Sequence, residues 1–190
     1  MSGSRPDPAV SISESFTRRA QLQPDAIALE AAGHRSTYAA LDADSNRLAR
    51  RLSALGVRRG DTVGVLAERG LETVVSALGA MKAGAAYVPL DPESPLWRTR
   101  SQLSDAGAQC LLTPESLAAA AHDAGLPVLA LDPRMRALAG DDPAPLELPV
   151  RVGTRGRLLS CAAGLPHTDR LGRCYGAAWP RAIRPASALA

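Results

Sequence analysis

Aromatic side chains are scarce in this chain of 190 residues and make up only 3% of it. Its core must therefore consist mainly of Ala, Leu and Val, and few rings remain on which nucleic-acid bases could stack. The rest of the composition, 46% hydrophobic and 22% charged, is typical of a globular protein with one ordinary domain. Binding of single-stranded nucleic acid through aromatic platforms is not expected.

Cysteine and histidine are also rare, with three residues of each type. The cysteines form no CxxC pair, and the histidines have neither zinc-ligand spacing nor a suitably spaced Ser, Cys or carboxylate. We therefore expect no metal site and identify no catalytic or cofactor-binding residue. The residues concerned are Cys110, Cys161, Cys174, His34, His122 and His167.

Long apolar runs are missing as well. No stretch of about 18 uncharged apolar residues occurs, and the first residues show neither a signal-peptide pattern nor a lipidation motif. No membrane partner is expected, and a cytoplasmic location is the default. Residues 1–13 are rich in Ser, Pro and Gly and are predicted to form a flexible leader.

Acidic residues almost disappear from the last forty positions. Residues 151–190 hold seven arginines and a single acid, Asp169, which places about +6 of charge there and leaves about −3 on residues 1–150. Such a basic tail can act as a nucleic-acid-binding arm, and this is a third hypothesis for the chain. The arginines are scattered among Gly, Ala and Pro rather than clustered, so we expect no nucleic-acid partner.

The chain does contain a regular alternation of strand-like and helix-like patterns over residues 14–150. This order predicts an α/β fold with three layers, in which a mostly parallel sheet is flanked by helices, followed by an irregular C-terminal tail at 151–190. The expected strands are 26–30, 34–37, 62–66, 86–90, 108–112 and 127–131. The expected helices are 14–22, 38–55, 71–82, 95–106 and 114–123.

Residues with capping properties mark the ends of two of these helices. Thr37 is suited to cap the helix that follows it, and Gly56 supplies the left-handed conformation that ends it. Ser94 as N-cap, with Pro95 at the first helical position, predicts the start of the helix 95–106.

Two segments carry a far more specific pattern, STYAAL at 36–41 and MKAGAAYVPLD at 81–91. They resemble L-[ST]-Y-x-E-L and L-K-A-G-x-A-Y-V-P-L-D, two signatures of the amino-acid-activating adenylation domains of nonribosomal peptide synthetases. The first departs from its signature at Ser36 and Ala40, and the second only at Met81. Segments at 16–28, 46–52 and 56–61 agree in order and spacing, so the resemblance covers about residues 14–131.

The resemblance implies the N-terminal α/β subdomain of the acyl-adenylate-forming superfamily, the AMP-binding ligases of secondary metabolism. We interpret the matching residues as architectural rather than chemical, since Gly84 ends a helix and Pro89 limits a strand. The residues of this structural signature are Thr37, Tyr38, Leu41, Lys82, Ala83, Gly84, Ala86, Tyr87, Val88, Pro89, Leu90 and Asp91.

Several side chains in or near these segments invite a functional interpretation, and each has a structural alternative that we favour. Lys82 could bind phosphate, but in the last turn of a helix it is expected to be solvated and to complement the helix dipole. Tyr38 and Tyr87 are expected to pack their rings, as is Trp97. Cys110 lies in an apolar strand and is expected to be an inert core thiol.

Complete members of the resembling family activate a carboxylic acid with ATP and magnesium and pass it to a carrier-protein thiol. They do so with a Ser/Thr/Gly-rich loop similar to [ST]-G-[ST]-T-G-x-P-K-G and with a catalytic lysine in a C-terminal subdomain, neither of which this sequence contains. We therefore expect a fragment of an AMP-forming acid ligase that binds no cofactor and has little or no activity alone.

The tail suggests one reason for the missing loop. Residues 163–166 can be encoded so that a reading frame shifted by one base gives Leu-Ala-Tyr, a tripeptide that commonly precedes this loop in the family. Continuing the shifted frame through residues 167–180 permits a sequence similar to the loop itself. We hypothesise that the tail is translated out of frame, which sequencing of codons 140–190 tests; a truncation with an unrelated tail is the alternative.

A second hypothesis belongs to a different class of protein. The chain could be a non-catalytic interaction or scaffolding module that keeps the N-terminal fold and docks with a partner supplying the missing half. An incomplete subdomain exposes apolar surface that the rest of an enzyme would cover.

Overall fold

The computed structural model describes residues 11–31, 33–67, 70–132, 135 and 138–146. The predictions for residues 1–10 and 151–190, which include His167, Cys161 and Cys174, lie outside the described residues.

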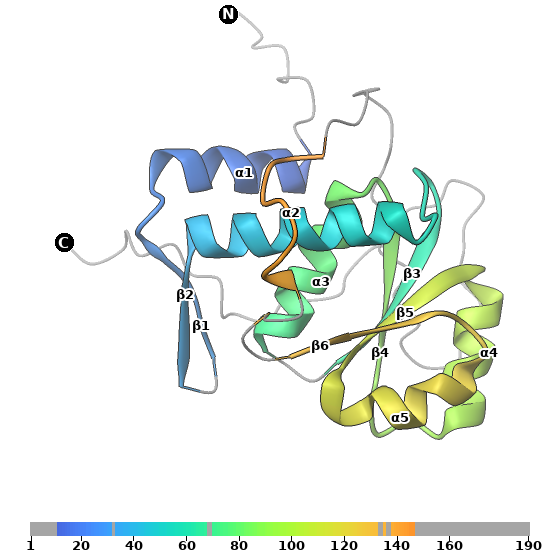
Figure 1. The fold of residues 1–190 in the computed structure, drawn as a ribbon. Coiled ribbons are helices and arrows are strands. Elements are labelled where there is room, and N and C mark those ends of the chain that lie inside the picture. The colour runs from blue at the N-terminus through green and yellow to red at the C-terminus, as the bar shows by residue number, and fades with distance from the viewer. Residues whose placement is uncertain (1–10, 32, 68–69, 133–134, 136–137, 147–190) are drawn as a thin grey trace, which may run out of the picture.

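The described chain begins with a helix and a hairpin (Figure 1). Helix α1 spans Ile12–Leu22 and starts two residues before the expected position, because Ser11 and Glu14 form a capping box in which each bonds the other's backbone amide. Strands β1 (Ile27–Ala31) and β2 (His34–Thr37) pair antiparallel as predicted.

Four parallel strands form the main sheet in the order β4-β3-β5-β6. Their bounds are Thr62–Leu66 for β3, Ala86–Leu90 for β4, Ala108–Pro114 for β5 and Val128–Leu131 for β6. The chain first extends the sheet from β3 to β4 and then returns past β3 to add β5 and β6, which is the doubly wound pattern of α/β proteins. The expected parallel sheet is confirmed.

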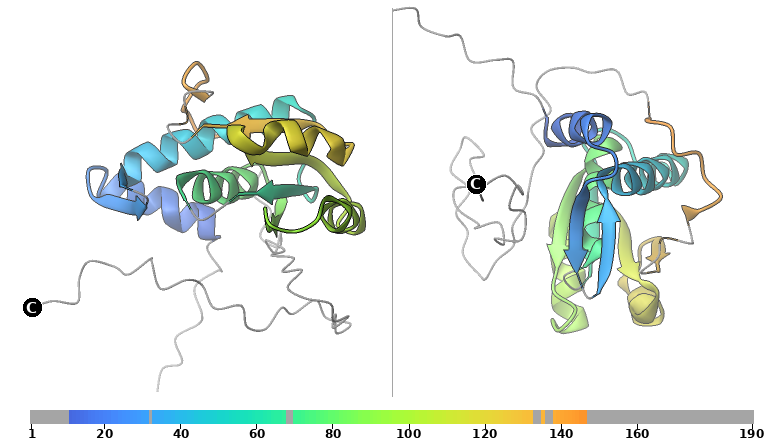
Figure 2. Two further views of the ribbon diagram at one scale, coloured as in Figure 1. Left: turned by 90° about the horizontal axis from the view of Figure 1, so that it is seen from below. Right: turned by 90° about the vertical axis from the view of Figure 1, so that its left-hand side faces the viewer.

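Helices cover both faces of this sheet, and Figures 1 and 2 show the layers from three sides. Helices α2 (Tyr38–Ala54) and α3 (Leu71–Lys82) pack together on one face. Helices α4 (Leu96–Asp105) and α5 (Ala118–Ala121) lie over the other face. The α/β class with three layers is therefore confirmed for the described part of the chain.

Two further helices differ from the prediction. Helix α4 begins one residue later, because Pro95 is itself the N-cap, with φ −57° and ψ 142°, and Ser94 makes no side-chain cap. The helix expected over 114–123 is broken: a 3₁₀ turn at Glu115–Leu117, the four residues of α5 and a second 3₁₀ turn at His122–Ala124 replace it. Leu117, at φ −106° and ψ −2°, departs from helical geometry and separates the first two pieces.

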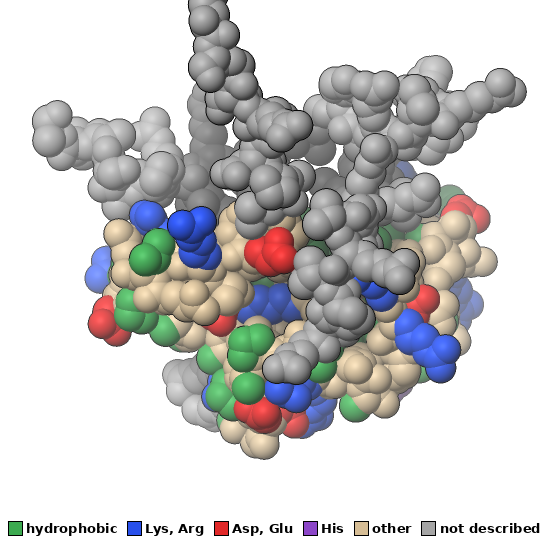
Figure 3. All heavy atoms as spheres, turned by 90° about the horizontal axis from the view of Figure 1, so that it is seen from above, with side chains coloured by type: hydrophobic (Ala, Val, Ile, Leu, Met, Phe, Trp, Pro, Cys, Tyr) green, Lys and Arg blue, Asp and Glu red, His purple; other side chains and the backbone are tan. Residues whose placement is uncertain are grey.

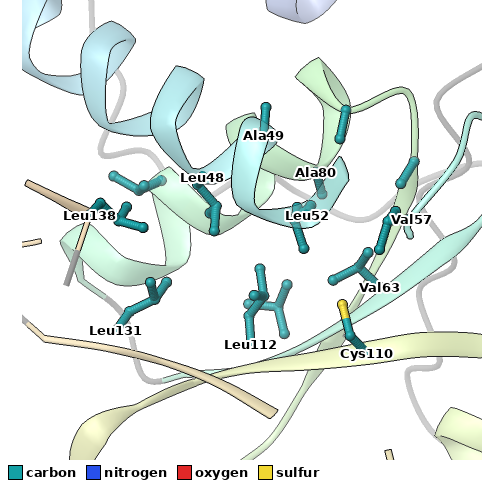
Figure 4. Close-up of a cluster of buried hydrophobic side chains, with 14 of the residues drawn as sticks. Leu48, Ala49, Leu52, Val57, Val63, Ala80, Cys110, Leu112, Leu131 and Leu138 are labelled. Carbon is teal, nitrogen blue, oxygen red and sulfur yellow. The ribbon is translucent and has the colours of Figure 1, made fainter. Parts of the chain in front are cut away.

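The buried core has one cluster on each side of the sheet. The cluster beneath α2 and α3 is the larger, and Figure 4 shows Leu48 and Leu52 of α2 facing Leu112 of β5, with Cys110 beside them. The cluster beneath α4 and α5 contains Val88, Leu103 and Leu111, among others. Leu, Val and Ala dominate both clusters, as the scarcity of aromatic residues predicts.

Candidate functional site

The signature residues lie in two places that the packing of α2 on α3 brings together. Residues 37–41 form the start of α2, and residues 82–91 run from the last residue of α3 through a tight turn and along β4. The two stretches meet where the Lys82 side chain at the end of α3 reaches the second turn of α2. This junction is the candidate site.

The first stretch fixes how α2 begins. The hydroxyl of Thr37 accepts a hydrogen bond from the Ala40 amide, which is the N-cap expected from the sequence. Tyr38 packs its ring 5.5 Å from that of Phe16 on α1, measured between centroids, while Leu41 is buried in the core. These residues orient α2 against α1 and the sheet.

The second stretch turns the chain from α3 into β4. Gly84 has φ +78°, and a Cβ there would lie 3.3 Å from the backbone of Arg59, so both its conformation and the close approach favour glycine. Its carbonyl accepts a hydrogen bond from the Gly60 amide, and the Ala86 amide donates to the Asp61 carbonyl. The turn is thereby docked on the loop that leads into β3.

Lys82 is buried at this junction, with only 8% of its side chain exposed. Its ammonium donates to the Asp42 carboxylate (Oδ1, 2.7 Å), to the Asp42 carbonyl (3.1 Å) and to Asn46 Oδ1 (2.7 Å). The expectation that Lys82 is solvated was wrong, because the α2–α3 contact covers it and the oxygens of α2 replace water. All three donors of the ammonium are occupied within the protein.

The partners of Lys82 are themselves fully engaged. The Asp42 carboxylate also accepts from the Thr17 hydroxyl at 2.7 Å and from Asn46 Nδ2 at 3.2 Å. The Phe16 ring lies 6.0 Å from the ammonium, at the limit of a cation–π contact. A polar network thus joins α1, α2 and α3.

Burial changes the ionisation of two signature side chains. Desolvation lowers the pKa of the Lys82 ammonium below its usual value, although the hydrogen bond and charge of Asp42 act in the opposite direction. Burial raises the pKa of the Tyr87 hydroxyl, whose ring packs against the core as expected. In both side chains the burial that positions them in the fold is the first cause of the pKa shift.

Other side chains considered from the sequence lie outside this network. Cys110 is 1% exposed, and burial raises the pKa of its thiol to about 11, so it is an inert core residue as predicted. His34 and His122 are exposed. Trp97 is 71% exposed, so the expectation that its ring packs was wrong; it lies on the outer side of the first turn of α4.

Sequence reasoning missed Asp42 and Asn46 as partners of Lys82. Their spacing of four residues on one helix face is visible in the sequence. Lys82 lies 40 residues after Asp42 and 36 after Asn46, however, and only the packing of α3 on α2 reveals the contact.

We next considered which groups among the described residues could hold a metal ion or a phosphate. These residues contain no group of three or more His, Cys, Asp or Glu side chains that could hold a metal ion, and the Lys82 ammonium has no free donor for a phosphate. None of the helices in the described ranges is both long and apolar enough to span a bilayer.

A doubly wound parallel sheet, a Gly84 turn docked on the preceding loop and a signature lysine turned inward define an N-terminal subdomain of the adenylate-forming class. The sequence model of the AMP-binding enzyme family matches residues 16–151. The chain belongs to this family.

Its curated relatives are nonribosomal peptide synthetases. Surfactin synthase subunit 1 of Bacillus subtilis (strain 168) is 40% identical over 151 residues, which cover 74% of this chain and 4% of the synthase. The dimodular nonribosomal peptide synthase of the same organism is 40% identical over 124 residues, or 65% of this chain and 5% of that protein. The chain thus spans only a small part of these relatives.

Solved structures agree with this assignment. The nonribosomal peptide synthetase FmoA3 (S1046A) superimposes with a TM-score of 0.68 and 38% identity over 77% of this chain and 16% of its own. O-succinylbenzoate coenzyme A synthetase (MenE) of Bacillus subtilis, solved in complex with AMP, has a TM-score of 0.59 and 28% identity over 72% of this chain and 34% of its own. The described fold is that of the N-terminal part of an adenylation domain.

Proposed function

We propose that this chain is the N-terminal scaffold of an adenylation domain that activates an amino acid or a related carboxylic acid, and that the 190 residues alone do not catalyse the reaction. In the complete family, the acid reacts with ATP to give acyl-AMP and is then passed to a carrier-protein thiol. In such a domain, the role of this chain is to hold the first sheet and its helices together.

The state of Lys82 carries this proposal. It is the only lysine among the 190 residues, whereas the resembling family uses one lysine in its phosphate loop and another in its C-terminal subdomain. The ammonium of Lys82 is buried and bonded three times to α2. No lysine in the chain is therefore free to offset the charge that develops on phosphate as the acid attacks ATP and pyrophosphate leaves.

ATP–pyrophosphate exchange tests the proposal. We expect the purified chain to give no exchange above background with a panel of amino and other carboxylic acids in the presence of magnesium. A complete adenylation domain from a relative, assayed in parallel, serves as the positive control. Robust exchange by the 190-residue chain would overturn the claim that it is catalytically incomplete.

Docking with a partner that supplies the rest of an adenylation domain is a second candidate function. Trp97 and Leu96, at the start of α4, are 71% and 38% exposed. The outer edge of β6 is unpaired among the described residues: Leu111 bonds the Pro127 carbonyl, so the N–H and C=O groups of Val128 and Ala130 point away from β5. Both features suit a surface that another polypeptide covers.

Light scattering and co-purification test docking. We expect the chain to form a complex of defined mass when mixed with the remaining segment of a related adenylation domain, and Trp97→Ser to weaken it. Arg98→Ser, on the same helix and also exposed, is the matched control. A monomer that never changes mass on mixing would count against docking.

A further inference from the structure

The segment that follows β6 does not leave the folded unit at once. Met135 and Leu138 return to the core beneath α2 and are 2% and 0% exposed. The Asp141 amide then donates to the Leu138 carbonyl, and residues 141–145 run across α2 (Figure 1).

Side-chain donors along α2 hold this segment. Arg47 Nε donates to the Asp141 carbonyl at 3.2 Å, and Asn46 Nδ2 donates to the Pro143 carbonyl at 2.9 Å. Arg51 Nε lies 2.6 Å from the Asp141 carboxylate. The side chains on one stripe of α2 therefore contact the segment at more than one residue.

Arg50 contacts three residues of the segment. Its Nε donates to the Ala144 carbonyl at 3.0 Å, its Nη2 donates to the Pro145 carbonyl at 3.3 Å, and Nη2 also lies 3.2 Å from the Asp142 carboxylate. The flat fork of a guanidinium can serve several acceptors at fixed angles, which a lysine ammonium cannot match.

The sequence of the segment explains why side chains make these contacts. Pro143 and Pro145 have no N–H, so the segment cannot pair as a regular strand, and its carbonyls need donors from elsewhere. Asp142 accepts a hydrogen bond from the Ala144 amide at 2.8 Å, which shapes the turn between the prolines. The arginines of α2 provide the missing donors.

The contact is also tied to the buried network. Asn46 is 2% exposed, and its amide group bonds Lys82 through Oδ1 and both Asp42 and Pro143 through Nδ2. The position of the segment is thus coupled to the same side chains that join α2 and α3.

From these contacts we infer that residues 141–145 form a latch, which closes on the stripe Asn46, Arg47, Arg50 and Arg51 and fixes the point beside α2 at which the chain continues beyond Pro145. The Pro-rich stretch interpreted from the sequence as a connector is, over these five residues, part of the folded unit. The latch itself does not depend on the proposed function, because it is defined by contacts within the chain.

The latch has a lower stability than the core. Its two ion pairs are partly exposed, with side-chain exposures of 34% and 58% for Arg50 and Asp142 and of 41% and 27% for Arg51 and Asp141. Exposed pairs are weak and are screened by salt. Figure 3 shows both acidic and basic side chains on the visible part of the face seen from above.

Amide hydrogen exchange, followed residue by residue by nuclear magnetic resonance on the full chain, tests the latch. In the double variant Arg50→Gln/Arg51→Gln we expect the amides of Asp141 and Ala144 to exchange at least about tenfold faster, while those of Val65 and Leu112 in the sheet stay unchanged. Arg98→Gln is the matched control, since this exposed arginine makes no ion pair within the described residues and its replacement should leave all four amides unaffected.

Two further measurements test how the arginines hold the latch. Arg50→Lys keeps the charge but not the fork, and we expect it to speed exchange at Ala144 in the same direction as Arg50→Gln. High salt should speed exchange at Asp141 in the unchanged chain more than in the double variant. Unchanged exchange at Asp141 and Ala144 in the double variant would overturn the latch, and full protection in Arg50→Lys would overturn the role of the guanidinium fork.

Discussion

Lys82 shows how one residue of a family signature can serve the fold. A positive charge at 8% exposure is tolerated because three oxygens of α2 accept hydrogen bonds from the ammonium. Removing one member of such a buried pair leaves the other charge without compensation, whereas removing both costs much less.

Substitution of Lys82 by Met keeps the length and apolar stem of the side chain and removes the charge. We expect the free energy of unfolding to fall by about 3 kcal/mol, because the Asp42 carboxylate loses its counter-ion in a buried position. Urea denaturation measures this, and the double variant Lys82→Met/Asp42→Leu should recover part of the loss. A single variant as stable as the unchanged chain would show that the network contributes nothing.

Cys110 makes the stability of the fold depend on pH in the alkaline range. Burial raises the pKa of its thiol from 9.0 to about 11, so between these values the folded state keeps a proton that the unfolded state releases. The stabilisation is complete below pH 9 and is lost as the pH rises towards 11, at up to about 1.4 kcal/mol per pH unit.

The variant Cys110→Ala tests this dependence through urea unfolding at several pH values. Alanine leaves a small cavity and lowers stability at every pH, but the fall in stability between pH 9 and about 11 should become shallower than in the unchanged chain. Parallel curves for the two proteins would mean that the thiol does not contribute to the alkaline loss.

At the scale of single residues, the sequence predicted what depends on local geometry. The Thr37 cap, the left-handed Gly56 and the end of α3 at Gly84 follow from neighbouring backbone positions and were confirmed. The burial of Lys82 and the exposure of Trp97 depend on which helix faces which surface, and both expectations were wrong. Local sequence does not contain that information.

Among the helices, the close packing of α2 on α3 depends on Gly79. A Cβ at this position would lie 2.7–2.9 Å from three atoms of Leu48, including its Cβ, which cannot move without shifting α2. In a helix, alanine is normally more favourable than glycine by about 1 kcal/mol. Whether Gly79→Ala raises or lowers the free energy of unfolding therefore shows whether helix propensity or packing dominates at this position.

We expect Gly79→Ala to lower the free energy of unfolding by about 1–2 kcal/mol, because overpacking outweighs the gain in helix propensity. A double-mutant cycle with Leu48→Ala should show a favourable coupling, since the smaller side chain makes room for the new methyl group. A stabilised Gly79→Ala variant, or a cycle without coupling, would contradict the packing shown by the structure.

Most strands and the longer helices were predictable because their hydrophobic period and end signals agree. The bounds of β3, α3 and β4 match the prediction residue for residue. The stretch between β5 and β6 was not predictable in this way: its run of alanines favours a helix, but without larger apolar side chains to pack it is divided into three short turns.

In the molecule as a whole, the described residues form a doubly wound unit, and the latch beside α2 is their last segment. The family assignment rests on residues 16–151, and the synthetases that share it are many times longer than this chain. We propose that these residues provide the scaffold of an adenylation domain, and that its chemistry depends on segments outside them.

One measurement tests this claim directly: ATP–pyrophosphate exchange by a chimaera in which residues 12–146 replace the matching segment of a surfactin synthase adenylation domain. With 40% identity to that relative, the scaffold should support exchange within about tenfold of the parent domain, while the 190-residue chain alone gives none. A soluble, folded chimaera without exchange, or exchange by the chain alone, would contradict the account.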